Sequence, residues 1–190
     1  MLTALRRVPH HEAGFTLVEL LVVVTLLAVV GSIVTAGVVQ ALSTARRGQA
    51  RVYALTDLEV GAHRIGRDLR AADPILVAQP DTLSLTVYRN GGRYRYDYVV
   101  AGGTMTETRT FYSTPTTSTV ASTASKPLIA ALDTSAGPTF TYTRTDGQPW
   151  VAGTDALDDI GQVEVVLARA LPEQDPIRVE TGIFLRNSVN

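Results

Sequence analysis

The sequence contains no cysteine, only three histidines and almost no net charge. Without cysteine, a disulfide framework, a thiolate metal site and a cysteine nucleophile are all excluded. Histidine has little scope as a catalyst or ligand, because His10 and His11 precede a long apolar run and His63 is expected on the solvent side of a helix. The 17 basic and 18 acidic residues nearly cancel, so bulk charge does not argue for a nucleic-acid partner.

The carboxylates show no arrangement typical of a reaction centre. Asp155, Asp158 and Asp159 bracket a loop that suits calcium in its residue types, but their spacing lacks the calcium-loop pattern, which favours a turn with capping aspartates. No Ser-His-Asp set, phosphate loop or metal motif is found. We therefore expect no enzyme and no cofactor. The remaining glutamates of the second half show no acid–base pairing: Glu107, Glu164, Glu173 and Glu180.

A long apolar run follows a short polar head. Residues 15–39 are apolar apart from one glutamate and four hydroxyl residues, and hydroxyls can bond back to helix carbonyls. As a helix the run would measure roughly 37 Å, enough to cross the ~30 Å hydrocarbon layer of a bilayer. The glutamate, Glu19, is unexpected, since an ionisable group at the centre of a membrane helix costs about 2.5 to 3.5 kcal/mol.

The order of the N-terminal segments differs from that of a secretory signal. Residues 1–14 are short and polar, and the apolar run begins directly after Gly14. A cut between Gly14 and Phe15 would leave the apolar run on the mature chain, whereas a secretory signal loses its apolar core.

The stretch GFTLVELLVVVTLL resembles the cleavage and methylation signature of type IV pilins and type II secretion pseudopilins. The match combines Gly14 before the cut, Phe15 after it and Glu19 as the fifth residue of the mature chain. The resemblance implies that a prepilin peptidase cuts after Gly14 and methylates the new amine of Phe15. It also implies that Glu19 is an assembly contact. Whether Glu19 pairs with the amine of its own chain or with that of a neighbouring subunit stays open.

The same resemblance implies partners and a location. The mature protein would lie in the bilayer of the bacterial cytoplasmic membrane as a single-pass protein with its head outside the cytoplasm, and would then join a filament. Expected partners are other pilins or pseudopilins, the prepilin peptidase, an inner-membrane platform protein and an assembly ATPase. Gly31 and Gly37 in the span have two interpretations, which are equally favoured. They either allow the helix to melt in part or allow neighbouring helices to pack closely.

Beyond the span, residues 42–73 are predicted to continue as an amphipathic outer helix that ends before Pro74. Its arginines are interpreted mainly as a solvated polar face, with DNA contact as the alternative. The apolar stripe is predicted to consist of Ala45, Val52, Leu55, Leu58, Ala62, Ile65 and Leu69.

Residues 74–190 are predicted to form an antiparallel β head. Alternating runs at 75–78, 82–89, 93–100 and 104–112 are separated by QPD, NGG and AGG, and NG between such runs is a strong hairpin signal. Residues 113–125 are mostly Ser and Thr and read as a surface loop, with at least three strands after it. Tyr94, Tyr96 and Tyr98 share one sheet face, which favours a core role over stacking of nucleobases.

Together these patterns predict an α+β, pilin-like fold, in which a long N-terminal transmembrane and amphipathic helix packs on an antiparallel sheet. A proline-leucine pair at 127–128, TFTYTRTDG, IGQVEVVLARA and a final T-x-x-x-LRN are similar to W-type minor pilins and J-type minor pseudopilins. The resemblance thus implies a structural minor subunit, at the filament tip as an initiator. The alternative is a bitopic, membrane-anchored module that binds a ligand or DNA.

Overall fold

The described residues form one long α-helix followed by eight strands, with two short 3-10 helices between strands. The computed structural model describes residues 16–114, 116, 119–172 and 174–185. Helix α1 spans Leu17–Arg70, and it stops before Pro74 as expected. The chain divides into two units after Gly48, so α1 supplies every described residue of the first unit except Thr16, and the opening element of the second. The α+β class and the pilin-like layout predicted from the sequence are confirmed.

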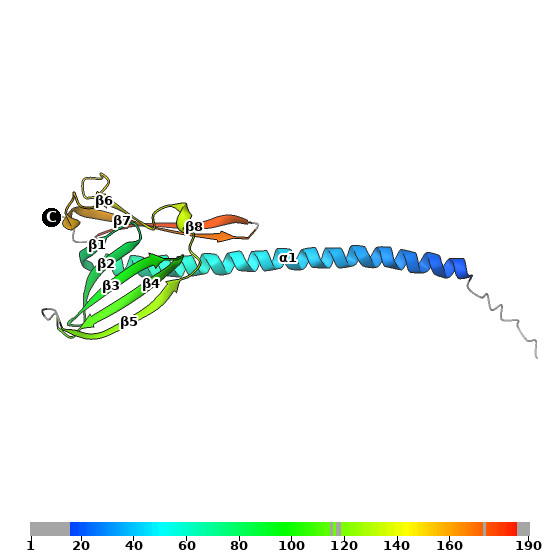
Figure 1. The fold of residues 1–190 in the computed structure, drawn as a ribbon, viewed down its shortest axis with the longest axis horizontal. Coiled ribbons are helices and arrows are strands. Elements are labelled where there is room, and N and C mark those ends of the chain that lie inside the picture. Colours follow the sequence, from blue (N-terminus) through cyan, green and yellow to red (C-terminus); the bar gives the residue numbers. More distant parts are fainter. Residues whose placement is uncertain (1–15, 115, 117–118, 173, 186–190) are drawn as a thin grey trace, which may run out of the picture. The chain divides into compact units, whose positions relative to one another are not determined.

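Five strands form the first sheet, in chain order (Figure 1). All of its neighbouring pairs are antiparallel, and the two-residue turns between β2 and β3 and between β3 and β4 have positive φ at both positions: Asn90–Gly91 and Gly102–Gly103. Such turns match the twist of a hairpin, which is why NG predicted this one correctly. The strands are β1 (Ala72–Ala78), β2 (Thr82–Arg89), β3 (Gly92–Ala101), β4 (Thr104–Tyr112) and β5 (Val120–Ile129).

Three further strands form a second antiparallel sheet in the order β6-β7-β8. They are β6 (Phe140–Arg144), β7 (Ile160–Leu171) and β8 (Gln174–Phe184), and the short 3-10 helices η1 (Thr134–Ala136) and η2 (Leu157–Asp159) lie in the connections. Alternate residues of β7, namely Val163, Val165 and Leu167, are completely buried. This alternation places one face of the second sheet in the core.

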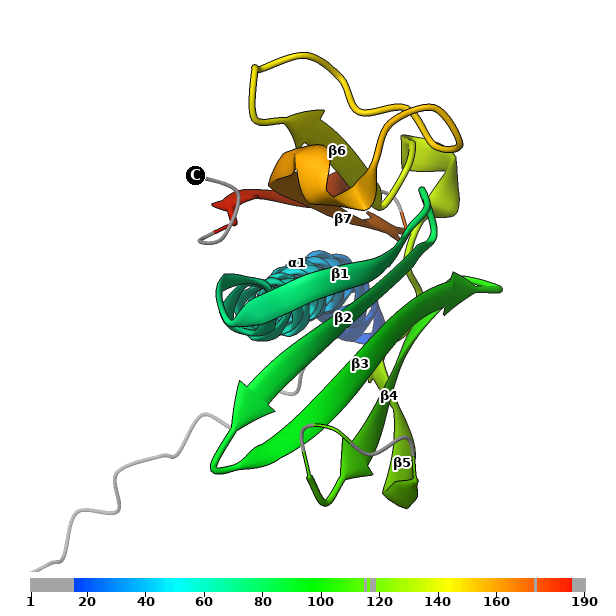
Figure 2. The same cartoon turned by 90° about the vertical axis from the view of Figure 1, so that its left-hand side faces the viewer.

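The second half of α1 lies between the two sheets (Figure 2). Leu58, Ile65 and Leu69 are completely buried there, together with Leu83 and Leu85 of β2. Arg169 of β7 bonds Asp57 of the helix at 3.2 Å and the carbonyl of Ala130 at 2.6 Å. A helix covered on both sides has its core stripe fixed by two surfaces, which leaves little freedom in its rotation.

The predicted helix stripe is correct in its second half and wrong in its first. Leu58, Ala62, Ile65 and Leu69 are buried, but Leu55 is 39% exposed and Val52 is 62% exposed, and Ala45 is also exposed. Ala54 and Gly61 are buried instead. At Gly61 the side chain of Ile129 occupies the space that a Cβ would need, and a hydrophobic pattern does not reveal such a fit.

The predicted Ser/Thr loop at 113–125 is too long. Residues from Val120 onward belong to β5, which pairs with β4 along its length. Thr108 and Ser125 share a hydrogen bond of 2.9 Å across the two strands. Threonine and serine tolerate a strand that is exposed on its edge, so the lack of large apolar residues did not indicate a loop here.

At Gly61 the helix packs closely against Ile129 of β5. A Cβ at this position would overlap Cδ1 and Cγ1 of Ile129 and lie 3.9 Å from Cδ1 of Leu167, so the Ile129 side chain would have to shift. Gly48, in contrast, has open space around it on the same helix. Packing thus favours glycine at 61, whereas glycine at 48 only weakens the helix.

A head fragment beginning at Leu42 is expected to be soluble and folded, because the buried side chains of the second unit come from residue 54 onward. Circular dichroism and gel filtration measure this. Aggregation of the fragment, or the absence of a cooperative unfolding transition, would contradict the packing of α1 within the head.

In that fragment, Gly61→Ala is expected to lower the free energy of unfolding by about 1 to 3 kcal/mol through overpacking against Ile129, despite the better helix propensity of alanine. The matched control, Gly48→Ala, should raise stability by up to about 1 kcal/mol. Urea unfolding followed by circular dichroism gives both values. Equal effects of the two substitutions would contradict the close approach at Gly61.

Candidate functional site

The start of α1 holds a helix cap made from the residues of the predicted assembly motif. Thr16 precedes the helix, and its Oγ1 accepts the backbone N–H of Glu19 at 3.3 Å. The carbonyl of Thr16 accepts the N–H of Leu20 at 3.2 Å, which is the first bond of the helix. One of the otherwise unpaired N–H groups at the helix start is therefore satisfied by a side chain.

Glu19 occupies the third position of the helix, in its first turn. A threonine cap followed three residues later by glutamate is the sequence of a capping box, and the N-terminal end of the helix dipole favours a carboxylate. The side chain is exposed, and no ion pair reaches it within the described part of the chain. The other two predicted residues of the motif, Gly14 and Phe15, lie outside the described residues.

None of the described apolar side chains of the first unit is buried. Large apolar residues between Leu17 and Leu42 are 46–81% exposed, so no described residue covers this length of α1. Its hydroxyl groups are satisfied locally: Ser32 donates to the carbonyl of Val29 at 2.7 Å and Thr35 to that of Gly31 at 2.8 Å. The helix is long and apolar enough to cross a membrane.

Residues 9–35 match the prokaryotic N-terminal methylation motif, the mark of prepilin-type signals. The chain therefore carries a prepilin-type signal at its N-terminus. The match includes the predicted cut and Glu19, as well as most of the apolar run. No curated protein matches the sequence at a significant level.

The chain therefore combines a prepilin-type signal, one helix fit for a single membrane crossing and a β head. A membrane anchor of this kind explains why the apolar side chains of the first unit lack cover, because lipid or neighbouring helices can supply it.

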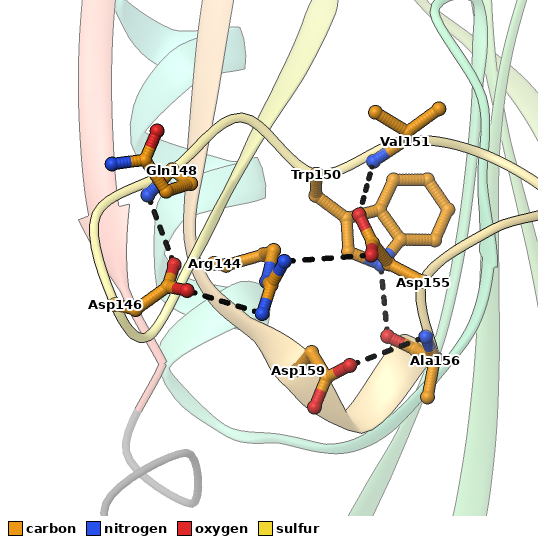
Figure 3. Close-up of polar contacts among 8 residues, drawn as sticks. All are labelled: Arg144, Asp146, Gln148, Trp150, Val151, Asp155, Ala156 and Asp159. Atoms are coloured by element: carbon orange, nitrogen blue, oxygen red, sulfur yellow. Dashed lines mark hydrogen bonds and ion pairs between the residues drawn. The ribbon is translucent and has the colours of Figure 1, made fainter.

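In the head, the aspartates of the predicted turn stabilise that turn (Figure 3). Asp155 accepts the N–H of Val151 at 2.8 Å, and Asp159 accepts the N–H of Ala156 at 3.3 Å. Arg144 lies between Asp146, at 3.1 Å, and Asp155, at 3.6 Å. The capping interpretation is confirmed for Asp155 and Asp159. Among the described residues, no three carboxylates or histidines come together in a group that could hold a metal ion.

Trp150 closes the same loop. Its indole N–H donates to the carbonyl of Ala156 at 2.8 Å, and its ring meets Tyr142 edge-on with a centroid distance of 5.6 Å. Burial raises the pKa of the Tyr142 phenol, whose hydroxyl donates to the carbonyl of Gln79 at 2.9 Å. The aromatic pair thus holds the loop against β6, and the Tyr142 hydroxyl links β6 to the turn between β1 and β2.

Two buried carboxylates, which the sequence did not single out, join α1 to the first sheet. Asp68 is 6% exposed and accepts the hydroxyl of Tyr98 at 2.7 Å, and Arg67 donates to it at 3.0 Å. Glu107 is 2% exposed and accepts Nη2 of Arg64 at 2.8 Å. The signal for Asp68 was available: it lies three residues after Ile65, on the buried stripe of the helix.

This network changes the interpretation of two residue sets. Arg64 does not belong to a freely solvated arginine face, since it pairs with a buried carboxylate of β4. The tyrosines of β3 share one face as predicted, with Tyr98 in the core and Tyr94 stacked on Phe111 at 4.8 Å. Their packing supports the core role over nucleobase stacking. His63 is exposed on the helix, as expected.

Burial, and then the Asp68 carboxylate, raise the pKa of the Tyr98 phenol far above its usual range. Because the folded pKa lies above the unfolded value of about 10, the neutral phenol stabilises the head fully below pH 10 and progressively less above it. Tyr98→Phe is expected to cost about 1 to 3 kcal/mol at pH 7, because it leaves Asp68 short of a donor.

Between pH 10 and 11 the free energy of unfolding should fall less steeply in the same variant, by up to about 1.4 kcal/mol per pH unit, than in the unsubstituted fragment. Urea unfolding of the head fragment at pH 7, 10 and 11 measures both effects. Tyr88→Phe is the control, since Tyr88 is 49% exposed. An alkaline slope that Tyr98→Phe leaves unchanged would contradict the buried phenol.

Proposed function

We propose that the mature protein is a structural minor pilin or pseudopilin subunit. The prepilin peptidase would cleave between Gly14 and Phe15 and methylate the new amine of Phe15. The subunit would then wait in the cytoplasmic membrane, with its head outside the cytoplasm, and enter a type IV pilus or a type II secretion pseudopilus. Other pilins, an inner-membrane platform protein and an assembly ATPase are its partners in that process.

The uncovered apolar surface of the first unit carries this proposal. A helix whose apolar side chains are 46–81% exposed must be covered by lipid or by other helices, and a filament core supplies the second cover once the subunit leaves the membrane. The head, in contrast, has its own core and needs no partner for folding. This division fits a subunit that assembles through its N-terminal helix.

Glu19 is the proposed contact between subunits. It lies four residues from the amine that cleavage would create, and it is exposed in the first turn of α1. A carboxylate and an ammonium that enter the apolar filament core together neutralise each other, whereas each alone is costly there. The pair would therefore fix the axial register of neighbouring helices.

The likeness of the second half to W-type and J-type subunits supports a place at the filament tip, where the protein would initiate assembly. An initiator needs the N-terminal helix for contact with the next subunit. Its head does not need to contact identical heads along the filament. The sequence pattern of the head, and not the N-terminal motif, carries this part of the proposal.

Mass spectrometry of the protein isolated from its native membrane tests the processing. The expected mature chain begins at Phe15 and carries one methyl group on its amine. A chain that still begins at Met1, in cells with an active prepilin peptidase, would overturn the proposal and leave a bitopic anchored module.

Substitution of Glu19 tests the assembly contact. Glu19→Ala should be cleaved and inserted normally, yet its amount in sheared or purified filaments should fall at least about tenfold, because the amine loses its counter-charge. Thr16→Ala is the matched control: it removes the side-chain cap of Glu19 but keeps the carboxylate, and it should cost helix stability of only about 1 kcal/mol.

Immunoblots of membrane and filament fractions give both results. Normal incorporation of Glu19→Ala would exclude the contact, and an equal defect in Thr16→Ala would reduce the role of Glu19 to capping of its own helix.

A further inference from the structure

Strand β5 is an open edge of the five-stranded sheet. β4 pairs with one side of it, and no described segment pairs with the other. All eight side chains from Val120 to Pro127 are exposed. Proteins commonly protect such edges with lysine or proline, and β5 has both only at its end, in Lys126 and Pro127. The six residues from Val120 to Ser125 leave free backbone groups that suit a further strand.

A basic pocket lies beside this edge. It has a volume of about 150 Å³ and is lined by Ala124, Ser125 and Lys126 of β5, by Glu107 and Arg109 of β4 and by Arg64 of α1. Three cations thus surround one carboxylate. Glu107 is 2% exposed and accepts a hydrogen bond from Arg64 at 2.8 Å, so Arg64 already neutralises its charge.

The other two cations of the pocket lack a carboxylate partner. Arg109 is exposed and lies beside the phenol of Tyr96, and Lys126 stands opposite Glu107 in the strand register. Neither forms an ion pair within the described part of the chain. The pocket therefore has an excess of positive charge that an anionic ligand can neutralise.

We propose that the β5 edge and this pocket together bind an extended acidic peptide segment of another protein, which adds as a sixth strand to the sheet. The backbone of the peptide pairs with β5, and one of its carboxylates occupies the pocket beside Lys126 and Arg109. This activity is separate from filament incorporation, since it uses no residue of the N-terminal helix before Gly48.

The register of β5 defines the pattern that the peptide needs. Ser122, Ala124 and Lys126 lie opposite Phe111, Arg109 and Glu107, so they share the face of the pocket. Thr123 and Ser125 lie on the other face, opposite Thr110 and Thr108. Residues of an added strand alternate in the same way, with Cβ atoms about 5 Å from those of β5. The ligand should thus carry Glu or Asp at alternate positions.

Full-length processed protein in maltoside micelles is the material for the test. The probe is a fluorescent ten-residue peptide, acetylated and amidated at its ends, in which Glu alternates with Val and Thr. A second peptide has Gln in place of Glu. A third keeps every Glu but has methyl groups on alternate backbone nitrogens, which removes the donors of one strand edge.

Fluorescence anisotropy should show binding of the first peptide, with affinity at least about tenfold lower for the Gln peptide and for the N-methylated peptide. Equal binding of the Gln peptide would overturn the role of the pocket. Equal binding of the N-methylated peptide would overturn strand addition, and no binding of the first peptide would overturn both.

Lys126 offers a direct readout because it is the only lysine in the chain. A carbodiimide joins a carboxylate to an amine without a spacer, so it should link a peptide Glu to Nζ of Lys126, and mass spectrometry locates the link. Lys126→Arg should bind the peptide within about twofold yet lose the link, because the guanidinium keeps the charge. Links formed only at the N-terminal amine would contradict the proposed position of the peptide carboxylate beside Lys126.

Charge reversal separates this site from general attraction. Lys126→Glu should lower the affinity for the Glu peptide at least about tenfold. The same variant should bind a peptide that has Lys in place of each Glu. Arg89→Glu, on an exposed arginine at the far end of β2, is the control and should change affinity by less than about twofold. Equal losses in the two variants would overturn the site. Peptide-independent links between two copies through Lys126 would assign the edge to a second copy and overturn the proposed occupant.

Discussion

An apolar helix that its own chain leaves uncovered is the constraint on which the account of this protein depends. From Leu17 to Leu42 the large apolar residues of α1 are open to their surroundings, and backbone and hydroxyl groups are satisfied within the helix. Such a segment is stable only in lipid or against other apolar helices. The prokaryotic N-terminal methylation motif, at residues 9–35, overlaps the start of this segment.

The head meets the opposite requirement. There the same helix is covered by two sheets, and its fit is fixed by small residues and by buried polar pairs. Gly61 admits Ile129, Asp68 holds Tyr98, and Glu107 holds Arg64. Apolar packing on both sides already limits the rotation of the helix, and hydrogen bonds of buried charged groups, which are costly to break, limit it further. These pairs therefore specify how the helix sits within the head.

Much of this arrangement could be predicted from the sequence. The helix limits, the first four strands and the hairpin at Asn90–Gly91 followed from periodicity and turn chemistry, which are local properties. The burial of Gly61 could not be predicted, since it depends on the side chain of Ile129, which comes from a distant strand. β5 was missed in part because an edge strand need not bury apolar residues. The motif residues were found, but Glu107 was not, because its partner lies 43 residues away.

The cysteine-free sequence allows a direct test of the exchange between lipid and subunit contacts. A single cysteine at Leu26 can be probed with a charged maleimide and with a short bifunctional thiol cross-linker, both before and during filament assembly. The account predicts no maleimide labelling in membranes and cross-links to neighbouring subunits in filaments. Rapid labelling of the membrane form by the charged maleimide would contradict it.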